Sequence, residues 1–504
     1  MTSSEHIPKK QKIESTEHVT QPKRKQLLIN FFENSSSSIH WSGQWKHPQD
    51  RSHTYKDLDY WLHLVKLAEK AKANIFIADS LALFDVWGKG DKESNFKGPL
   101  HYGIQAPKNE PSAPVAAMAA VSKNVGFTVT VSTISEHPYH LARRLATLDH
   151  LTKGRISWNI VSSFLPSTGK QVLNGAPLPE HDSRYTKSEE YLKVIYKLLL
   201  SSWRDDAVVL DKERGVFVDT DRVREINHVG EHFNVVGPSL SEPSNQRLPV
   251  LVQAGASTKG RQFAAQHAEV VYVSALTAEA LGKKIKEFKD LAETYGRGRN
   301  DIKYVASATV ISGKTEEEAL EKYEEIKKHA DTVGAQVLFG GWTGIDLSQW
   351  EDDQELEHVE NNGMKTYIEN LTKFNPGKKF TKKSISEKIS LGGSISALFV
   401  GTGSQIADQI EEYVDKSDVD GFNFTYAVWP QSFEDVVDYV IPELQERGLS
   451  QKEWPVEGGT FRENLNGKKG QTFVPKTHPA YNYRWSNDLT KEEFETKLEN
   501  LNIK

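Results

Sequence analysis

Several apolar segments of the chain end in polar side chains that could bind a ligand. Asp79 follows one apolar run, Thr133 and His137 follow a second, and Asn159 interrupts a third. A buried amide such as that of Asn159 must find hydrogen-bond partners, either among its neighbours or on the edge of a bound heterocycle. If the runs are parallel strands, their carboxyl ends meet at one edge, and these polar groups converge there.

A phosphate-binding turn is suggested by the segment Ala254-Gly-Ala-Ser-Thr-Lys-Gly260, which leads from a fourth apolar run into a helix. Its small residues let an anion approach backbone N–H groups at the positive end of the helix, and the Ser257 hydroxyl adds a donor. Ser257 could equally be an ordinary N-cap, Asp79 could cap the turn that follows it, and His137 could be structural. The spacing alone leaves both interpretations open.

Familiar catalytic and metal motifs are absent from the sequence. There is no Walker A sequence, no HExxH and no EF-hand loop, the histidines are dispersed, and we expect no metal site. Lys259 stands where a nucleophile elbow needs its second glycine, which makes a serine hydrolase a weak hypothesis. The run Gly401-Thr-Gly403 has Ile406 in place of the third glycine of the dinucleotide fingerprint, so no NAD-binding Rossmann site is expected. The lack of cysteine excludes disulfides, thiolate metal sites and a cysteine nucleophile.

Composition narrows the classes of partner. The chain has 504 residues, with 63 Lys and Arg against 69 Asp and Glu, a formal net charge of −6, and no long basic stripe. Nucleic acid is therefore not expected as a partner. No apolar run of 18 residues occurs and the mean hydropathy is −0.57, so no membrane span is expected. Residues 1–25 are polar and lack the apolar core of a signal peptide, which predicts a disordered tail on a cytoplasmic protein.

These polar residues must be positioned by an alternating series of strands and helices. Eight short β-branched or aromatic runs alternate with stretches of helical period, which predicts an α/β fold, a (β/α)₈ barrel over residues 26–450. The predicted strands are 27–32, 75–79, 126–133, 156–162, 249–254, 270–274, 304–311 and 422–427.

A bare barrel needs about 250 residues, so much of the chain must be insertions, which we expect near 83–113, 205–247 and 331–400. In the second of these, 215–220 and 231–236 alternate like a small hairpin. We expect the third to pack over the barrel mouth, and 451–504 to wrap the outside as a C-terminal extension.

The ordered motifs resemble one family. The run Val131 to Ser163 resembles the third and fourth strand region of bacterial-luciferase-like flavin monooxygenases. More narrowly it is similar to the branch of nitrilotriacetate monooxygenase component A, EDTA monooxygenase, dibenzothiophene-sulfone monooxygenase and long-chain alkane monooxygenase. Further matching runs are 77–80, 182–191, 246–265, 420–427 and 433–448, so the resemblance spans about residues 26–450 in order.

The resemblance implies a cofactor and partners. It implies reduced FMN bound at the barrel mouth and supplied by a separate NAD(P)H-dependent flavin reductase. Asp79, Thr133 and Asn159 would line the isoalloxazine, while Tyr185 and Ser257 would hold the phosphate. The implied activity is the use of O₂ to oxygenate a small organic substrate, with cleavage of a C–N or C–S bond as in relatives, by a homodimer or homotetramer.

Two histidines are candidates for handling oxygen or its proton. His40 lies in a family-like segment, 39–48, after the first strand, and His137 is the second candidate. Three alternatives stay open at this point. One is a barrel hydrolase that pairs Asp79 with Glu136 as its two carboxylates. The others are a non-catalytic flavin-binding protein and a relative that uses a deazaflavin.

Overall fold

The computed structural model describes residues 25–37, 39–90, 92, 94–255, 257–356, 368, 379–392 and 396–502. The tail predicted over residues 1–25 lies outside the described residues except for Lys25. Its ammonium lies 2.8 Å from the carboxylate of Asp420 and 3.2 Å from that of Asp418, so the described chain begins with an anchored residue.

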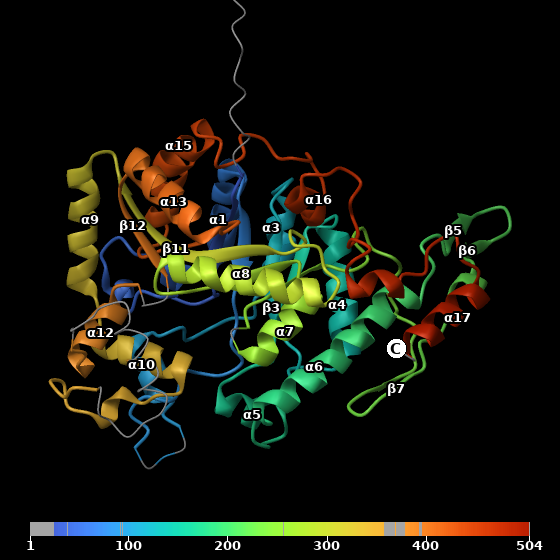
Figure 1. Ribbon diagram of the computed structural model, residues 1–504, viewed down its shortest axis with the longest axis horizontal. Helices are drawn as coiled ribbons and strands as arrows, with labels where there is room; N and C mark the ends of the chain where they lie inside the picture. The colour runs from blue at the N-terminus through green and yellow to red at the C-terminus, as the bar shows by residue number, and fades with distance from the viewer. Residues whose placement is uncertain are drawn as a thin grey trace, which may run out of the picture.

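Eight parallel strands close into a barrel, as predicted (Figure 1). They are β1 (Leu28–Glu33), β2 (Asn74–Ile77), β3 (Phe127–Ser132), β4 (Ile156–Val161), β9 (Val250–Gln253), β10 (Val270–Val273), β11 (Lys303–Gly313) and β13 (Gly421–Thr425). The barrel closes because β1 pairs with β2 on one edge and with β13 on the other. Nearly every residue of these strands is buried, which explains why they read as continuous apolar runs in the sequence.

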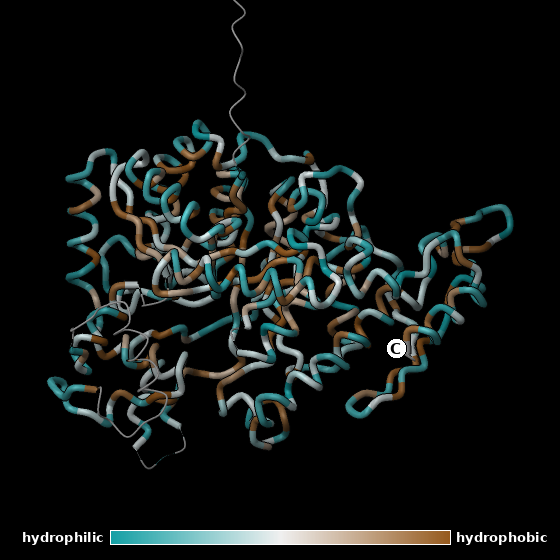
Figure 2. Tube along the Cα trace, viewed as in Figure 1, coloured by the Kyte–Doolittle hydropathy of each residue, from teal (hydrophilic) through white to brown (hydrophobic). Residues whose placement is uncertain are grey.

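Helices cover the outside of the barrel and follow the strands along the chain. The main ones are α1 (Leu58–Ala71), α3 (Val115–Ala120), α4 (Pro138–Leu151), α6 (His181–Tyr196), α7 (Thr258–His267), α8 (Ala278–Thr294), α9 (Glu316–His329), α13 (Gly403–Ser417), α14 (Gln431–Asp435) and α15 (Ile441–Glu446). Each long helix buries one apolar stripe against the strands, and apolar residues gather toward the barrel in Figure 2.

A ninth strand, β12 (Ala397–Thr402), was not predicted. It pairs in parallel with the second half of β11, on the edge opposite β13, because Ala308 and Thr309 have partners in both strands. Four of its six residues are only partly buried, and its apolar run, Ala397 to Val400, falls within the third predicted insertion, so we did not predict it as a strand. At the end of β12, Thr402 and Gln405 make a capping box that starts α13.

The second insertion forms two hairpins where we predicted one. β5 (Val208–Asp211) pairs with β6 (Val216–Val218), and β7 (His228–Val229) pairs with β8 (Asn234–Val235). The two predicted segments therefore belong to different hairpins, each closed by its nearest neighbour in sequence. Both hairpins extend away from the barrel beside α17 (Lys491–Asn502) (Figure 1).

The two ends of the barrel differ in what covers them. At the amino ends of the strands, α16 (Phe461–Asn466) packs Phe461 against Val250, Val252 and Val270, so that end is filled. At the opposite end lie α2 (Lys97–Tyr102), α5 (Pro166–Val172), α10 (Thr332–Thr343) and α12 (Lys382–Ser390) (Figure 1). They share a second apolar cluster that includes Phe84, Leu165, Phe339 and Ile385. Over the described ranges, no helix has the length and apolar character needed to cross a membrane.

Candidate active site

The barrel interior carries a polar pair near the carboxyl ends of β3 and β4. Asn159 donates from Nδ2 to the hydroxyl of Thr130 at 2.9 Å, and both side chains are buried. The neighbouring Trp158 packs against Tyr191 of α6, so strand alternation directs Asn159 toward the barrel axis. The Oδ1 atom of Asn159 has no hydrogen-bond partner. The predicted amide therefore offers a free acceptor inside the barrel, and Thr130 is a neighbour that the sequence analysis did not single out.

Three aromatic rings in contact line the same interior, of which Phe32 and Phe76 are stacked and Tyr272 is tilted against Phe76. The ring centroids of Phe32 and Phe76 lie 4.6 Å apart, and those of Phe76 and Tyr272 lie 4.4 Å apart. The edge of the His40 imidazole meets Phe32 at 5.6 Å. These contacts place His40 directly against the aromatic lining of the barrel mouth.

His40 is held between the barrel and the third insertion. Its ring also contacts Trp342 of α10 edge to face, with the ring centroids 5.3 Å apart, so α10 reaches the barrel mouth. Burial lowers the pKa of His40 to about 4, which makes the ring neutral at pH 7. Its Nδ1 is buried and has no hydrogen-bond partner. A neutral imidazole with a free nitrogen can donate or accept one hydrogen bond to a ligand, depending on its tautomer.

Asp79 lies beyond the end of β2, beside a lysine from the first insertion. Burial raises the pKa of Asp79 to about 6, although the charge of Lys108 opposes that rise. Burial lowers the pKa of Lys108 to about 8, and its ammonium donates to the Ser80 hydroxyl at 3.2 Å. Lys108 was missed in the sequence because it lies among other charged residues in an insertion.

A second buried carboxyl ends β1. Glu33 accepts a hydrogen bond from the Tyr60 hydroxyl and another from the Asn34 backbone at 2.8 Å. Its side chain is fully buried, and this burial raises its pKa to about 7. Lys108 interacts electrostatically with both Glu33 and Asp79, so three ionisable groups are coupled at one side of the mouth.

Tyr185 and Ser257 come together at the amino end of α7. Ser257 accepts from the Gly260 backbone N–H at 3.0 Å, which makes it the N-cap. A Cβ on Gly260 would lie 2.7 Å from the Tyr185 hydroxyl, and a Cβ on Gly255 would lie 2.8 Å from the Gly260 Cα. The two glycines thus keep backbone and hydroxyl groups close together, in the arrangement that anion sites at helix ends use.

Thr133 and His137 lie on the other side of the β3 end. The Thr133 hydroxyl lies 2.7 Å from that of Ser188, one turn along α6 from Tyr185. His137 is exposed and its Nδ1 accepts from the Tyr139 N–H at 3.3 Å, so it caps α4. Their roles toward a flavin or oxygen stay predictions.

Comparison with known proteins identifies the family. Residues 39–418 match the family described as luciferase-like monooxygenase. The chain belongs to the luciferase-like monooxygenases. It is 40% identical over 462 residues to dimethyl-sulfide monooxygenase of Hyphomicrobium sulfonivorans, a match that covers 92% of this chain and 94% of that protein.

Solved structures of luciferase-like monooxygenases and related proteins share the whole fold. The crystal structure of long-chain alkane monooxygenase has a TM-score of 0.83 with 40% identity, over 92% of this chain and all of the other. A riboflavin lyase solved with modified FMN and riboflavin has a TM-score of 0.82 with 30% identity, over 91% of this chain and all of the other. The protein is therefore a flavin-dependent monooxygenase. The alternative of a paired-carboxylate hydrolase is not supported, and Glu136 is bound instead to the Arg144 guanidinium.

Proposed function

We propose that the barrel mouth binds reduced FMN and that the protein is the oxygenase component of a two-component system acting on a small organic substrate. The observation that carries this proposal is the pair of unpartnered polar atoms, Asn159 Oδ1 and His40 Nδ1, buried in the mouth of a barrel of this family. Buried polar atoms without partners are costly, and a ligand that supplies the missing hydrogen bonds gives them a reason to persist.

The phosphate of FMN fits the amino end of α7. The hydroxyls of Ser257 and Tyr185 lie at the start of α7, beside backbone N–H groups of its first turn, around a space that a Cβ on Gly260 would fill. The helix adds its positive end. No aspartate or glutamate opens α7, so nothing in its first turn repels an anion.

The ring system of FMN fits the polar wall beside the aromatic lining. Asn159 would accept a hydrogen bond from a flavin ring N–H through its free Oδ1. Asp79 lies beyond the end of β2, and β3 separates β2 from the strand β4 that carries Asn159. Lys108 places a cation beside Asp79, which suits an electron-rich reduced ring. Phe32, Phe76 and Tyr272 provide the apolar contact that most cofactor pockets need.

The chain itself contributes orientation, exclusion of water and proton handling. Bound reduced flavin supplies the reaction with O₂. Trp342 and α10 cover His40 from the solvent side, which limits the entry of bulk water. Neutral His40 carries one ring proton and one free nitrogen, so it would hold or transfer a proton at the reacting edge.

A separate flavin reductase would supply the reduced cofactor. The dinucleotide fingerprint is incomplete at Ile406, and the Gly401–Gly403 segment is used to cap α13. An oxygenase of this kind has no need of its own nicotinamide site, because another protein carries out the hydride transfer. The substrates named for the relatives include dimethyl sulfide and long-chain alkanes, so small sulfides and hydrocarbons are the first candidates.

The proposal is tested by anaerobic titration with photoreduced FMN, followed by admission of O₂ with a substrate panel. We expect saturable binding of reduced FMN, tighter than that of reduced riboflavin, and consumption of O₂ with formation of an oxygenated product. If reduced FMN does not bind, the proposal is wrong. If it binds but no member of a panel of sulfides, alkanes and amino acids yields product, the proposed class of substrate is wrong.

A further inference from the structure

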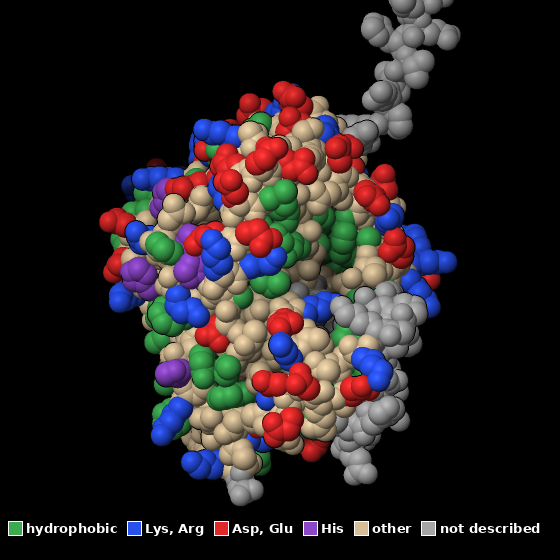
Figure 3. All heavy atoms as spheres, turned by 90° about the vertical axis from the view of Figure 1, so that its left-hand side faces the viewer, with side chains coloured by type: hydrophobic (Ala, Val, Ile, Leu, Met, Phe, Trp, Pro, Cys, Tyr) green, Lys and Arg blue, Asp and Glu red, His purple; other side chains and the backbone are tan. Residues whose placement is uncertain are grey.

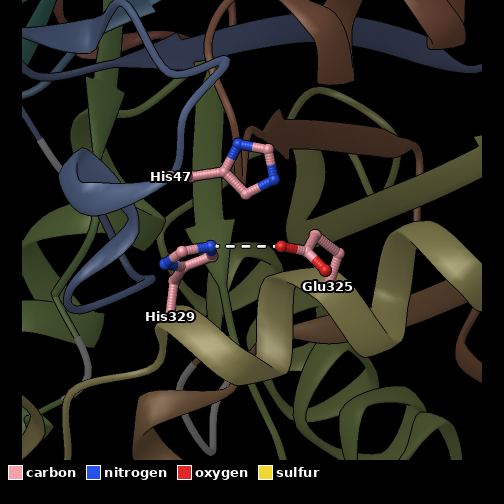
Figure 4. Close-up of side chains that lie close together, drawn as sticks. All are labelled: His47, Glu325 and His329. Atoms are coloured by element: carbon pink, nitrogen blue, oxygen red, sulfur yellow. Dashed lines mark hydrogen bonds and ion pairs between the residues drawn. The ribbon is translucent and has the colours of Figure 1, made fainter.

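Two histidines and a glutamate meet outside the barrel mouth. His47 follows the short helix η1 (Gln44–Lys46) after β1, while Glu325 and His329 lie one turn apart on α9. Figure 4 shows all three side chains turned toward a common point between the β1 segment and the helix. Among the described residues, this is the one group of three or more His, Asp or Glu side chains close enough to hold a metal ion.

The spacing suits a single ion. One ligand atom from each residue lies within 4.8 Å of the others, and His329 Nε2 is 3.3 Å from Glu325 Oε1. Ligands about 2.0–2.2 Å from a tetrahedral Zn²⁺ lie roughly 3.4 Å apart, so the pair on α9 already has the required separation. The ligand atom of His47 lies within 4.8 Å of the other two, so it must approach them by at most about 1.4 Å.

The carboxylate and the first histidine are oriented by neighbours. Lys328 binds Glu325 Oε2 at 2.6 Å and thus leaves Oε1 on the side of His329. His47 accepts from the Gln49 N–H at Nδ1, at 3.2 Å, and no described residue is bonded to its Nε2. Ligation through Nε2 requires the ring proton to move to Nδ1, so this long contact with Gln49 must open. Such a neutral hydrogen bond contributes little compared with a metal–imidazole bond.

The cluster borders a hollow that can admit an ion and its water. His47 and Glu325 line a cavity of about 280 Å³ together with Lys322 and Asp435. Lys322 is paired with Asp435 at 2.8 Å and with Glu318 at 3.0 Å, so its charge is already balanced. The face that carries α9 mixes acidic and basic side chains, and histidines gather along one edge of it (Figure 3). Because the surface charge is mixed, the ion must be selected by its three ligands and not by the electrostatic potential of this face.

We propose that His47, Glu325 and His329 bind one divalent transition-metal ion of the Zn²⁺ class, with the remaining position open to the cavity. Two imidazoles and one carboxylate are the donor set that such ions prefer over Mg²⁺ or Ca²⁺. This site is separate from the flavin site, and no step of the proposed oxygenation uses it.

The ion would act as a clamp on the segment that carries His40. The Gln44 amide already donates to the Ile326 carbonyl at 2.8 Å, and the Ser42 hydroxyl to the Asp331 carbonyl at 2.7 Å. A metal ion shared by His47, Glu325 and His329 would add a third link between this segment and α9, at the residue that follows η1. The expected consequence is a higher melting temperature in the presence of the ion.

The test is calorimetric titration of the tag-free full chain with ZnCl₂ alone, after removal of metal with a chelator. We expect one Zn²⁺ per chain and a Kd in the micromolar range. His329→Ala removes a ligand and Glu325→Gln replaces a charged carboxylate by a neutral amide, so each should weaken binding by about tenfold or more. Matched controls are Glu324→Gln on the same helix and His53→Ala in the neighbouring exposed turn, which should bind Zn²⁺ as the unaltered chain does.

Co²⁺ provides a second measurement that reports on the ligands. Co²⁺ bound at low coordination number by imidazole and carboxylate gives strong visible absorption, which His47→Gln should abolish. If His47→Gln fails to fold, His329→Ala on the partly exposed helix decides the matter. Failure of the unaltered chain to bind Zn²⁺ at 100 µM, or unchanged binding in His329→Ala, would overturn the proposal. Neither result would affect flavin binding, so the two proposals fail separately.

Discussion

Asn159 donates to Thr130 across the β3–β4 pair at 2.9 Å, yet its own Oδ1 is buried and unpartnered. An unsatisfied buried acceptor costs on the order of 1–3 kcal/mol. The pair therefore lowers the stability of the barrel relative to an apolar filling of the same volume. Sites that violate a packing rule in this way are commonly those that function requires.

Replacing the pair by Asn159→Leu with Thr130→Val should leave stability unchanged or raise it while it weakens flavin binding. The double variant removes both polar groups at nearly constant volume, so neither partner is left unsatisfied. We expect the Kd for reduced FMN to rise by about tenfold or more, which corresponds to the loss of one good hydrogen bond. Thermal unfolding and anaerobic flavin titration check the two halves of this prediction.

Thr147→Val is the matched control for this pair. Thr147 is exposed on α4, and its hydroxyl bonds only to the Arg143 carbonyl of the preceding turn. It should change neither quantity appreciably. A double variant that binds reduced FMN with unchanged affinity would show that Asn159 is a structural amide.

The second prediction separates the capping role of Ser257 from its phosphate role. Ser257→Ala should lower the free energy of unfolding by about 1 kcal/mol through loss of the N-cap. It should also weaken FMN more than riboflavin, because only FMN carries the phosphate. Thr277→Ala removes an equivalent cap from α8, where Thr277 accepts from the Ala280 N–H at 3.2 Å. Thr277→Ala should lower the free energy of unfolding and leave the affinity for both flavins unchanged. If Ser257→Ala weakens the binding of FMN and riboflavin equally, there is no phosphate site at this cap.

The sequence allowed the barrel to be predicted because parallel strands are buried on both faces. Each barrel strand is a short apolar run, so residue type alone marks it, and the order of strands and helices then implies closure. Asn159 and Ser257 could be singled out for the same reason. Each is a polar residue at the end of, or within, a segment whose neighbours must be buried.

The features that were missed depend on contacts between distant segments. Lys108 acquires its unusual environment from Asp79 and Ser80 only when the first insertion folds over the mouth. His47 meets His329 only after β11 and α9 have been placed beside the first loop. β12 does contain an apolar run, Ala397 to Val400, but that run falls inside the segment predicted as the third insertion, and it pairs with β11 outside the eight-stranded ring. No local pattern of residues signals the arrangements at Lys108 and His47.

Glu33 should give the protein a pH-dependent stability that Glu33→Gln lacks. Burial raises the folded-state pKa from 4.5 to about 7, so the folded chain binds this proton more tightly than the unfolded chain. Below pH 4.5 the carboxyl of Glu33 is protonated in both states and does not destabilise the folded chain. Between pH 4.5 and pH 7 the free energy of unfolding falls as the pH rises, and above pH 7 the loss stays constant at about 3 kcal/mol. Denaturant unfolding between pH 5 and pH 7.5 should show the variant gaining stability relative to the parent as pH rises.

The control for Glu33 is Glu69→Gln, which should behave differently over this range. Burial raises the pKa of Glu69, but hydrogen bonds from Asn124, Lys123 and Val125 outweigh it, and the net pKa is lowered. Its contribution is present above pH 4.5 and is lost only as pH falls below that value. The difference between parent and Glu69→Gln should therefore be flat from pH 5 to pH 7.5. A flat difference for Glu33→Gln as well would contradict a buried carboxyl of raised pKa.

His40→Phe tests whether the buried imidazole acts on a proton or only packs. Phenylalanine keeps the edge contacts with Phe32 and Trp342, so the melting temperature should hold or rise, and reduced flavin should still bind. Loss of the ring nitrogens should lower kcat by about a hundredfold, the usual scale for removing a general acid or base. Because burial holds the pKa of His40 near 4, the parent should show no loss of kcat from protonation of this ring between pH 6 and pH 8.

The matched control is His140→Phe, which replaces an exposed histidine on α4 and should leave kcat unchanged. A His40→Phe variant with full kcat would assign the ring to packing and leave proton transfer to another group at the mouth.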